Sequence, residues 1–139
     1  MLGKPASAAR KGDAMSLGKI LVVDDEPEVR RLLQDFLSSR GYDVVLAADG
    51  METLATVADQ EPDLVLLDVA MPVMNGVETL TKIAALDPPV RVIMVTANAD
   101  ISLMAKLLAL GAVDYIPKPF DLDYLEQAVS IQLAAAREP

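Results

Sequence analysis

Five short apolar segments, each followed by a stretch with helical spacing, constrain the fold of this chain more than any other feature. The segments lie at residues 20–23, 44–47, 64–67, 92–95 and 115–116. They are continuously apolar rather than alternating, which is typical of strands buried on both faces. Strands that alternate with helices along a chain form a parallel sheet covered by helices on both sides. We therefore expect one α/β domain, a doubly wound (βα)5 unit with a parallel five-stranded sheet.

The stretches between the strands carry the expected helical signals. In the first, apolar residues recur at i, i+3, i+4, i+7 and i+8: Val29, Leu32, Leu33, Phe36 and Leu37. Pro27 suits the first turn of this helix and Gly41 its exit. Asp121 can cap the last helix, whose apolar positions are Leu122, Leu125, Val129 and Leu133. Residues 50–59, 76–86 and 101–110 predict the other three helices.

Composition excludes several classes of protein. Lys and Arg number 12 against 21 Asp and Glu, which gives a net charge of −9 and argues against direct binding of nucleic acid. The chain has no Cys and no His. Disulfides, the common zinc sites, His-based triads and a phosphohistidine on this chain are therefore excluded. Charges interrupt every apolar stretch well short of the ~20 residues of a spanning helix, so we expect a soluble, cytoplasmic protein without membrane contacts.

The ends of the chain differ from its centre. Residues 1–17 are small, polar and weakly basic, without the apolar run of a secretory signal. We expect a disordered leader at 1–17, a folded domain at 18–136 and a short tail at 137–139.

Polar side chains follow four of the five predicted strands. Asp24 and Asp25 follow the first, Asp68 the third, Thr96 the fourth and Lys118 the fifth. Any one of these acids is equally consistent with a helix cap, but the carboxyl ends of parallel strands meet at one edge, where ligands bind in open α/β sheets. Three neighbouring carboxylates repel one another unless a cation joins them. Oxygen ligands without His or Cys favour a hard ion, and Mg²⁺ suits phosphate chemistry.

Four motifs give the chain a family resemblance. They read LVVDDEP at 21–27, DVAMPVMNG at 68–76, VTA at 95–97 and DYIPKPF at 114–120. In this order and spacing, residues 19–136 resemble the receiver domain of two-component response regulators. The resemblance implies a flavodoxin-like sheet with strand order 2-1-3-4-5.

The resemblance also implies a role for each site residue. Asp68 would be the phosphoacceptor, taking a phosphoryl group from a phosphohistidine on a histidine kinase or a histidine phosphotransfer protein. Asp25 would bind Mg²⁺ directly and Asp24 mainly through water, with Asp68 and the backbone carbonyl of Ala70 completing the set. Lys118 would pair with the phosphoryl oxygens, and its bond to the following proline would be cis. The chain would then be no enzyme beyond Mg²⁺-dependent phosphorylation and dephosphorylation of itself at Asp68.

Thr96 and Tyr115 resemble the switch pair of this family. Between them, the helix predicted at 101–110 is apolar nearly all round. Either this helix is sunk between its neighbours, or part of it contacts a downstream effector or a second copy of the chain. Its position between the switch residues favours the second reading. The face that we predict comprises Leu103, Lys106, Leu107 and Leu110.

Other functions fit the residues less well. A phosphatase of the haloacid type would need a second acid at position 70, where this chain has Ala70. A flavin or dinucleotide binder would need a glycine-rich loop after the first strand, where the chain has acids instead. A receiver that never takes phosphate stays possible in principle. We expect a stand-alone relay or adaptor receiver, and the alternative is the receiver half of a larger regulator with a DNA-binding or enzymatic output domain.

Overall fold

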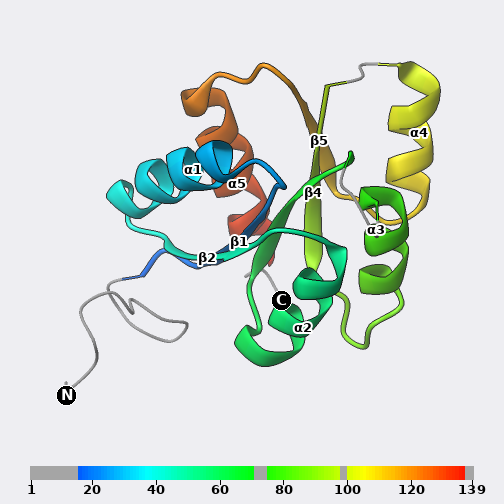
Figure 1. Cartoon of the computed structure of the whole chain (residues 1–139), viewed down its shortest axis with the longest axis horizontal. Helices are drawn as coiled ribbons and strands as arrows, with labels where there is room; N and C mark the ends of the chain where they lie inside the picture. The colour runs from blue at the N-terminus through cyan, green and yellow to red at the C-terminus, as the bar shows by residue number, and fades with distance from the viewer. Residues whose placement is uncertain (1–15, 71–74, 98–99, 137–139) are drawn as a thin grey trace.

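Five strands alternate with five helices (Figure 1). The computed structural model describes residues 16–70, 75–97 and 100–136. The strands are β1 (Lys19–Val23), β2 (Asp43–Ala47), β3 (Leu64–Asp68), β4 (Arg91–Thr96) and β5 (Asp114–Pro117). The helices are α1 (Pro27–Ser39), α2 (Gly50–Gln60), α3 (Gly76–Ala84), α4 (Ile101–Ala109) and α5 (Leu122–Ala136). All ten elements were predicted, and for the eight whose bounds were predicted the observed bounds differ by two residues or fewer at each end.

The strands form one parallel sheet in the order β2-β1-β3-β4-β5, which confirms the predicted fold class. β1 lies between β2 and β3, and Leu21 is in register with Val45 on one side and Val65 on the other. Because all strands run in the same direction, their carboxyl ends share one edge of the sheet.

Alternate residues of the strands enter two separate cores. Ile20 and Val22 point toward α1 and α5, whereas Leu21 and Val23 point toward α2, α3 and α4. Figure 1 shows this division, with α1 and α5 together on one side of the strands. The central strands β1 and β3 are buried along their whole length. Each fully buried Leu, Ile or Val side chain stabilises the fold by about 1.5–3 kcal/mol, which explains the continuous apolar runs.

Short polar side chains fix the starts of the helices. Asp49 accepts a hydrogen bond from the Glu52 N–H, and Asn75 accepts one from the Glu78 N–H. Asp121 caps α5 as predicted, because its carboxylate accepts from the N–H of Asp123 at 2.8 Å. These caps pair N–H groups of a helix's first turn that have no partner within the helix.

The described chain begins just ahead of β1. The N–H of Leu17 donates to the Gly41 carbonyl at 3.0 Å, and Gly41 has a φ of +99°, which suits the predicted exit of α1. Residues 1–15 of the predicted leader, the predicted tail 137–139 and positions 71–74 of the second motif lie outside the described residues. Among the described helices, none has the length and apolar composition needed to span a bilayer.

Candidate functional site

The polar residues predicted at the strand ends lie together at the carboxyl edge of the sheet. Asp68 and Thr96 are the last residues of β3 and β4, while Asp24, Asp25 and Lys118 follow β1 and β5. A cavity of about 470 Å³ opens at this edge. Its lining consists of Asp25, Glu26, Asp68, Val69, Ala70, Thr96, Ala97, Leu103 and Lys118.

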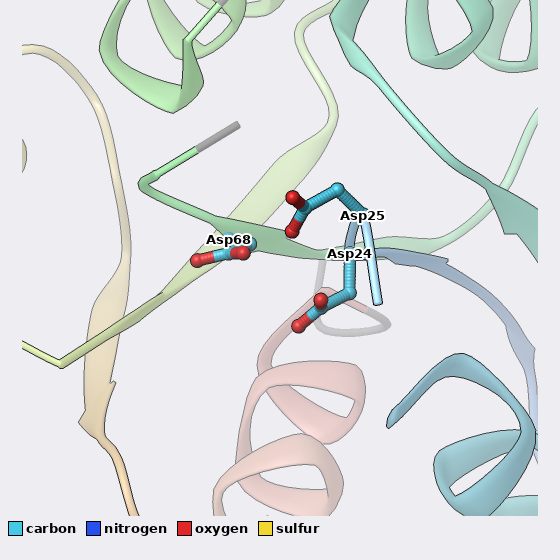
Figure 2. A group of neighbouring side chains, drawn as sticks. All are labelled: Asp24, Asp25 and Asp68. Carbon is cyan, nitrogen blue, oxygen red and sulfur yellow. The ribbon is translucent and has the colours of Figure 1, made fainter. Parts of the chain in front are cut away.

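The three acids form one cluster. A carboxylate oxygen from each of Asp24, Asp25 and Asp68 lies within 4.8 Å of the others. Figure 2 shows the three carboxylates around a common space between the ends of β1 and β3. Asp24 and Asp68 are buried, at 3% and 5% exposure, whereas Asp25 is exposed. One side of the cluster is therefore enclosed by protein and the other is open to solvent.

Lys118 is the positive group of the site. Its Nζ donates to Asp24 Oδ2 at 3.1 Å and lies 3.6 Å from Asp68 Oδ2. The N–H of Lys118 donates to the Thr96 carbonyl at 2.7 Å, which ties the residue to the end of β4. Its bond to Pro119 is cis, as predicted. The amine thus lies beside the predicted phosphoacceptor and one of the predicted metal ligands.

The burial and charges of the cluster shift the pKa of Asp68 and the pKa of Lys118. Burial, and after it the charge of Asp24, raises the pKa of Asp68 from 3.8 to about 6, although Lys118 and the N–H of Ala70 act in the opposite direction. Burial by itself lowers the pKa of Lys118, but the hydrogen bond and charge of Asp24, together with the charge of Asp68, outweigh it and raise that pKa. One lysine therefore leaves the repulsion among the acids partly uncompensated.

This donor set fits a hard divalent cation. Oxygen atoms are its side-chain donors, and burial together with the charge of Asp24 raises the pKa of Asp68, so a cation bound here would stabilise the ionised carboxylate. Mg²⁺ prefers such carboxylate sites with room for water, and the open side at Asp25 provides that room. Ala70 lines the same cavity and donates its N–H to Asp68 Oδ1 at 3.2 Å. The role of its carbonyl as a ligand stays a prediction.

The structure also explains a glycine whose role the sequence analysis did not identify. Gly76 begins α3, and its N–H donates to the Val69 carbonyl at 2.8 Å. A Cβ on Gly76 would lie 2.3 Å from the main-chain oxygen of Asp68, far inside van der Waals contact. Only glycine therefore lets α3 start this close to the end of β3.

The predicted switch residues lie on neighbouring strands. Tyr115 of β5 is in register with Met94 of β4, and Thr96 is in register with Pro117. Thr96 is buried and lines the cavity, whereas Tyr115 is half-buried and packs against the core beneath α4. Their movement on phosphorylation stays a prediction.

The predicted partner face on α4 was partly wrong. Leu107 is fully buried in the core, and Leu110 is half-buried against the same core. Leu103 is half-buried and lines the cavity of the acid site. Among the four residues, Lys106 is the exposed one. The helix is rotated relative to our expectation, so that its solvent side presents Ile101, Ala105 and Leu108.

A larger cavity, of about 650 Å³, lies at the opposite edge of the sheet. Its polar lining residues are Glu61, Asp63, Asp87 and Arg91, among prolines and aliphatic side chains. None of the five polar residues predicted at the strand ends lies there. The smaller cavity is therefore the candidate site, because the acids and Lys118 converge there, although the other cavity is larger.

The fold and the site together define a class: doubly wound α/β domains that carry an acid cluster and a lysine at the carboxyl edge of the sheet. The family model of the response regulator receiver domain matches residues 20–130. This chain therefore belongs to the response regulator receiver family.

Individual relatives fall into two groups. The chain is 40% identical over 111 residues to sporulation initiation phosphotransferase F of Bacillus subtilis, covering 80% of this chain and 90% of that protein. It is 41% identical over 119 residues to the transcriptional regulatory protein ZraR of Salmonella typhimurium, covering 86% of this chain but only 27% of the relative. Several other matched regulators are likewise longer, so that the chain spans about a quarter to a half of their length.

Solved structures agree with this assignment. A CheY-like response regulator receiver domain protein from Methanospirillum hungatei is similar with a TM-score of 0.82 and 34% identity, covering 87% of this chain and 97% of that one. The chemotaxis protein CheY4 of Vibrio cholerae is similar with a TM-score of 0.77 and 31% identity, covering 85% and 98%.

Proposed function

We propose that this receiver accepts a phosphoryl group on Asp68 from a phosphohistidine of a partner histidine kinase or histidine phosphotransfer protein. The observation that carries the proposal is the position of the buried Asp68 carboxylate. It lies within one cluster with Asp24 and Asp25, and 3.6 Å from the Lys118 amine. The relative in Bacillus subtilis, which is named a phosphotransferase, supports the same chemistry. A cytoplasmic location, expected from the sequence, stays a prediction.

In the proposed reaction, an oxygen of ionised Asp68 forms a bond to phosphorus as the bond from phosphorus to the donor's imidazole nitrogen breaks. The electron pair stays with the imidazole, which takes up a proton. Lys118 is placed to pair with the oxygens of the transferred group, as a point charge at 3.6 Å from the acceptor carboxylate. Mg²⁺ held by Asp24, Asp25 and Asp68 would neutralise the negative charge that gathers between the phosphoryl group and the acids.

The small residues around Asp68 support access for a phosphoryl group. Ala70 and Ala97 are exposed and line the cavity. Water that reaches the aspartyl phosphate through the same opening would hydrolyse it, so we expect self-dephosphorylation in addition to phosphorylation. No other catalytic activity is proposed.

Phosphorylation adds about −1.5 to −2 charge beside Lys118 and Thr96. We expect Thr96 to donate to the new phosphate and Tyr115 to follow it inward, which would change the surface near α4. The partner surface that we now propose there consists of Ile101, Leu108 and Lys106, and a second copy or an effector protein would bind it. Ile101 is 77% exposed and Leu108 is 45% exposed.

Acetyl phosphate, a small phosphodonor, tests the acceptor assignment. Intact mass spectrometry should show one added phosphoryl group on the wild-type chain in the presence of Mg²⁺, and none on Asp68→Asn. Asp35→Asn, the same chemical change at an exposed position of α1, serves as the matched control and should be labelled like the wild type. Phosphate incorporation that persists in Asp68→Asn would refute the proposal.

Sedimentation in the presence of beryllofluoride and Mg²⁺ tests the surface. Leu108→Glu should weaken self-association, whereas Leu32→Glu on α1, at a similar exposure of 48%, should not. Equal assembly of Leu108→Glu and wild type would exclude this face as the self-association surface.

A further inference from the structure

Arg30 contacts the acid site, and this contact could not be predicted from the sequence. Its Nη1 donates a hydrogen bond to the main-chain carbonyl of Asp24. Arg30 is half-buried in the first turns of α1, where its own N–H donates to the Glu26 carbonyl at 3.1 Å. Asp24 lies just past the last residue of β1. The arginine therefore supplies a partner for a carbonyl at the point where the strand has ended.

The other polar groups of Asp24 are also held. Its N–H donates to the Ala47 carbonyl at 3.3 Å. Its Oδ1 accepts from the Glu26 N–H at 2.9 Å, and its Oδ2 accepts from Lys118 at 3.1 Å. With the bond from Arg30, both the backbone and the carboxylate of Asp24 are fixed in orientation.

Asp25 depends on this arrangement more than the other two acids. Its side chain is exposed, and in the described part of the chain its carboxylate has no hydrogen bond or ion pair. Figure 2 shows this carboxylate turned toward Asp68. The peptide that joins Asp24 to Asp25 carries the carbonyl to which Arg30 donates. The hydrogen bond from Arg30 therefore acts on the peptide that leads into Asp25.

We propose that Arg30 is a positioning residue for the cation site. By holding the Asp24–Asp25 peptide, it directs the Asp25 carboxylate into the space shared with Asp24 and Asp68. It thereby increases the affinity for a hard divalent cation without contacting that cation. The inference rests on the proposed function, because it requires the acid cluster to bind Mg²⁺.

The charge of Arg30 and its hydrogen bond to Asp24 predict opposite changes in Mg²⁺ affinity when the residue is replaced. Arg30 carries a positive charge near a cation site, so its removal should strengthen Mg²⁺ binding if Coulomb repulsion is all that matters. Loss of the hydrogen bond should instead let Asp25 move and weaken binding, as loss of groups that orient metal ligands does elsewhere. The sign of the change in affinity therefore separates the two roles.

Calorimetric titration of the metal-free full chain with Mg²⁺ measures that sign. We expect Arg30→Gln to bind Mg²⁺ about tenfold more weakly than wild type. Arg31→Gln removes the same charge from the neighbouring, exposed position and should bind with unchanged or slightly higher affinity. In the Asp25→Asn background, Arg30→Gln should cause no further loss, because the arginine acts through Asp25.

Each other result has a definite meaning. If Arg30→Gln binds as tightly as wild type or more tightly, while Asp25→Asn weakens binding, the role of Arg30 is overturned and the cation site stands. If Asp25→Asn leaves the affinity unchanged, the cation site itself fails, and this inference with it.

Urea unfolding distinguishes positioning from a purely structural role. A lower unfolding midpoint of Arg30→Gln with unchanged Mg²⁺ affinity would overturn the inference. Should this variant not fold, Arg30→Lys keeps the charge with a shorter reach and should bind Mg²⁺ more weakly than wild type. Equal affinity of Arg30→Lys and wild type would then overturn it.

Discussion

Replacing Asp68 with asparagine is expected to stabilise the metal-free protein at neutral pH. Burial and the charge of Asp24 raise the pKa of Asp68 from 3.8 to about 6, so the folded protein holds this proton more tightly than the unfolded chain does. Linkage then requires the free energy of unfolding to fall as the pH rises between these two values and to stay low above them. Asparagine keeps the shape of the side chain but does not ionise. The free energy of unfolding of the variant therefore does not fall with pH through this group.

The magnitude follows from the two pKa values. Their difference corresponds to at most about 3 kcal/mol, at about 1.4 kcal/mol for each pH unit. Solvent at the open side of the cluster reduces the effect. We therefore expect the variant to gain about 1–3 kcal/mol over the wild type between about pH 4 and about pH 7.

Urea unfolding followed by circular dichroism, with EDTA present, measures this difference across the pH range. A constant offset from the amide group is the same at every pH, so the change of the difference with pH measures the contribution of the carboxylate. Asp35→Asn, at the exposed α1 position, should run parallel to wild type throughout. A difference for Asp68→Asn that is flat with pH, or that shrinks as the pH rises, would refute the electrostatic reasoning.

Three further predictions concern the rest of the molecule. Leu107→Ala should cost about 2–5 kcal/mol of stability in urea unfolding, whereas Leu108→Ala should cost less than about 1; equal costs would mean that α4 is rotated differently. Asp121→Ala removes the cap on the Asp123 N–H and should lower stability by about 1 kcal/mol, so an unchanged thermal midpoint would contradict the cap. Labelled duplex DNA should show no salt-sensitive rise in anisotropy with this chain, because its net charge is −9; such a rise would contradict that expectation.

The strands were predictable because their centres are buried on both faces. β1 was expected at residues 20–23, and the structure adds only Lys19. Charged residues also begin β2 and β4, at Asp43 and Arg91. Apolar patterns miss such residues. Lys19 is nevertheless buried, with its Nζ donating to the Gln60 carbonyl at the end of α2.

The site was predictable as a set of residues but not as an arrangement. The end of the first strand predicted that Asp24 and Asp25 lie together. The sequence does not show, however, that Asp24 is buried and Asp25 exposed. Arg30 was missed because an arginine in a helix is usually a solvated charge, and its bond is to a backbone atom that leaves no sequence signal. The exposed face of α4 was predicted wrongly because the sequence of a helix that is apolar all round does not show which side faces the core. Packing in the folded protein places Leu107 inward.

The ion pair between Lys118 and Asp24 joins residues that are 94 positions apart, which affects how a growing chain assembles this site. During synthesis, the three acids emerge before β4 and β5, so a nascent chain carries the carboxylates without their amine and with one edge of β3 unpaired. Unpaired strand edges are templates for pairing with other chains. Because Lys118 is the last of these site residues to be translated, any chain interrupted before it cannot complete the cluster of acids and lysine.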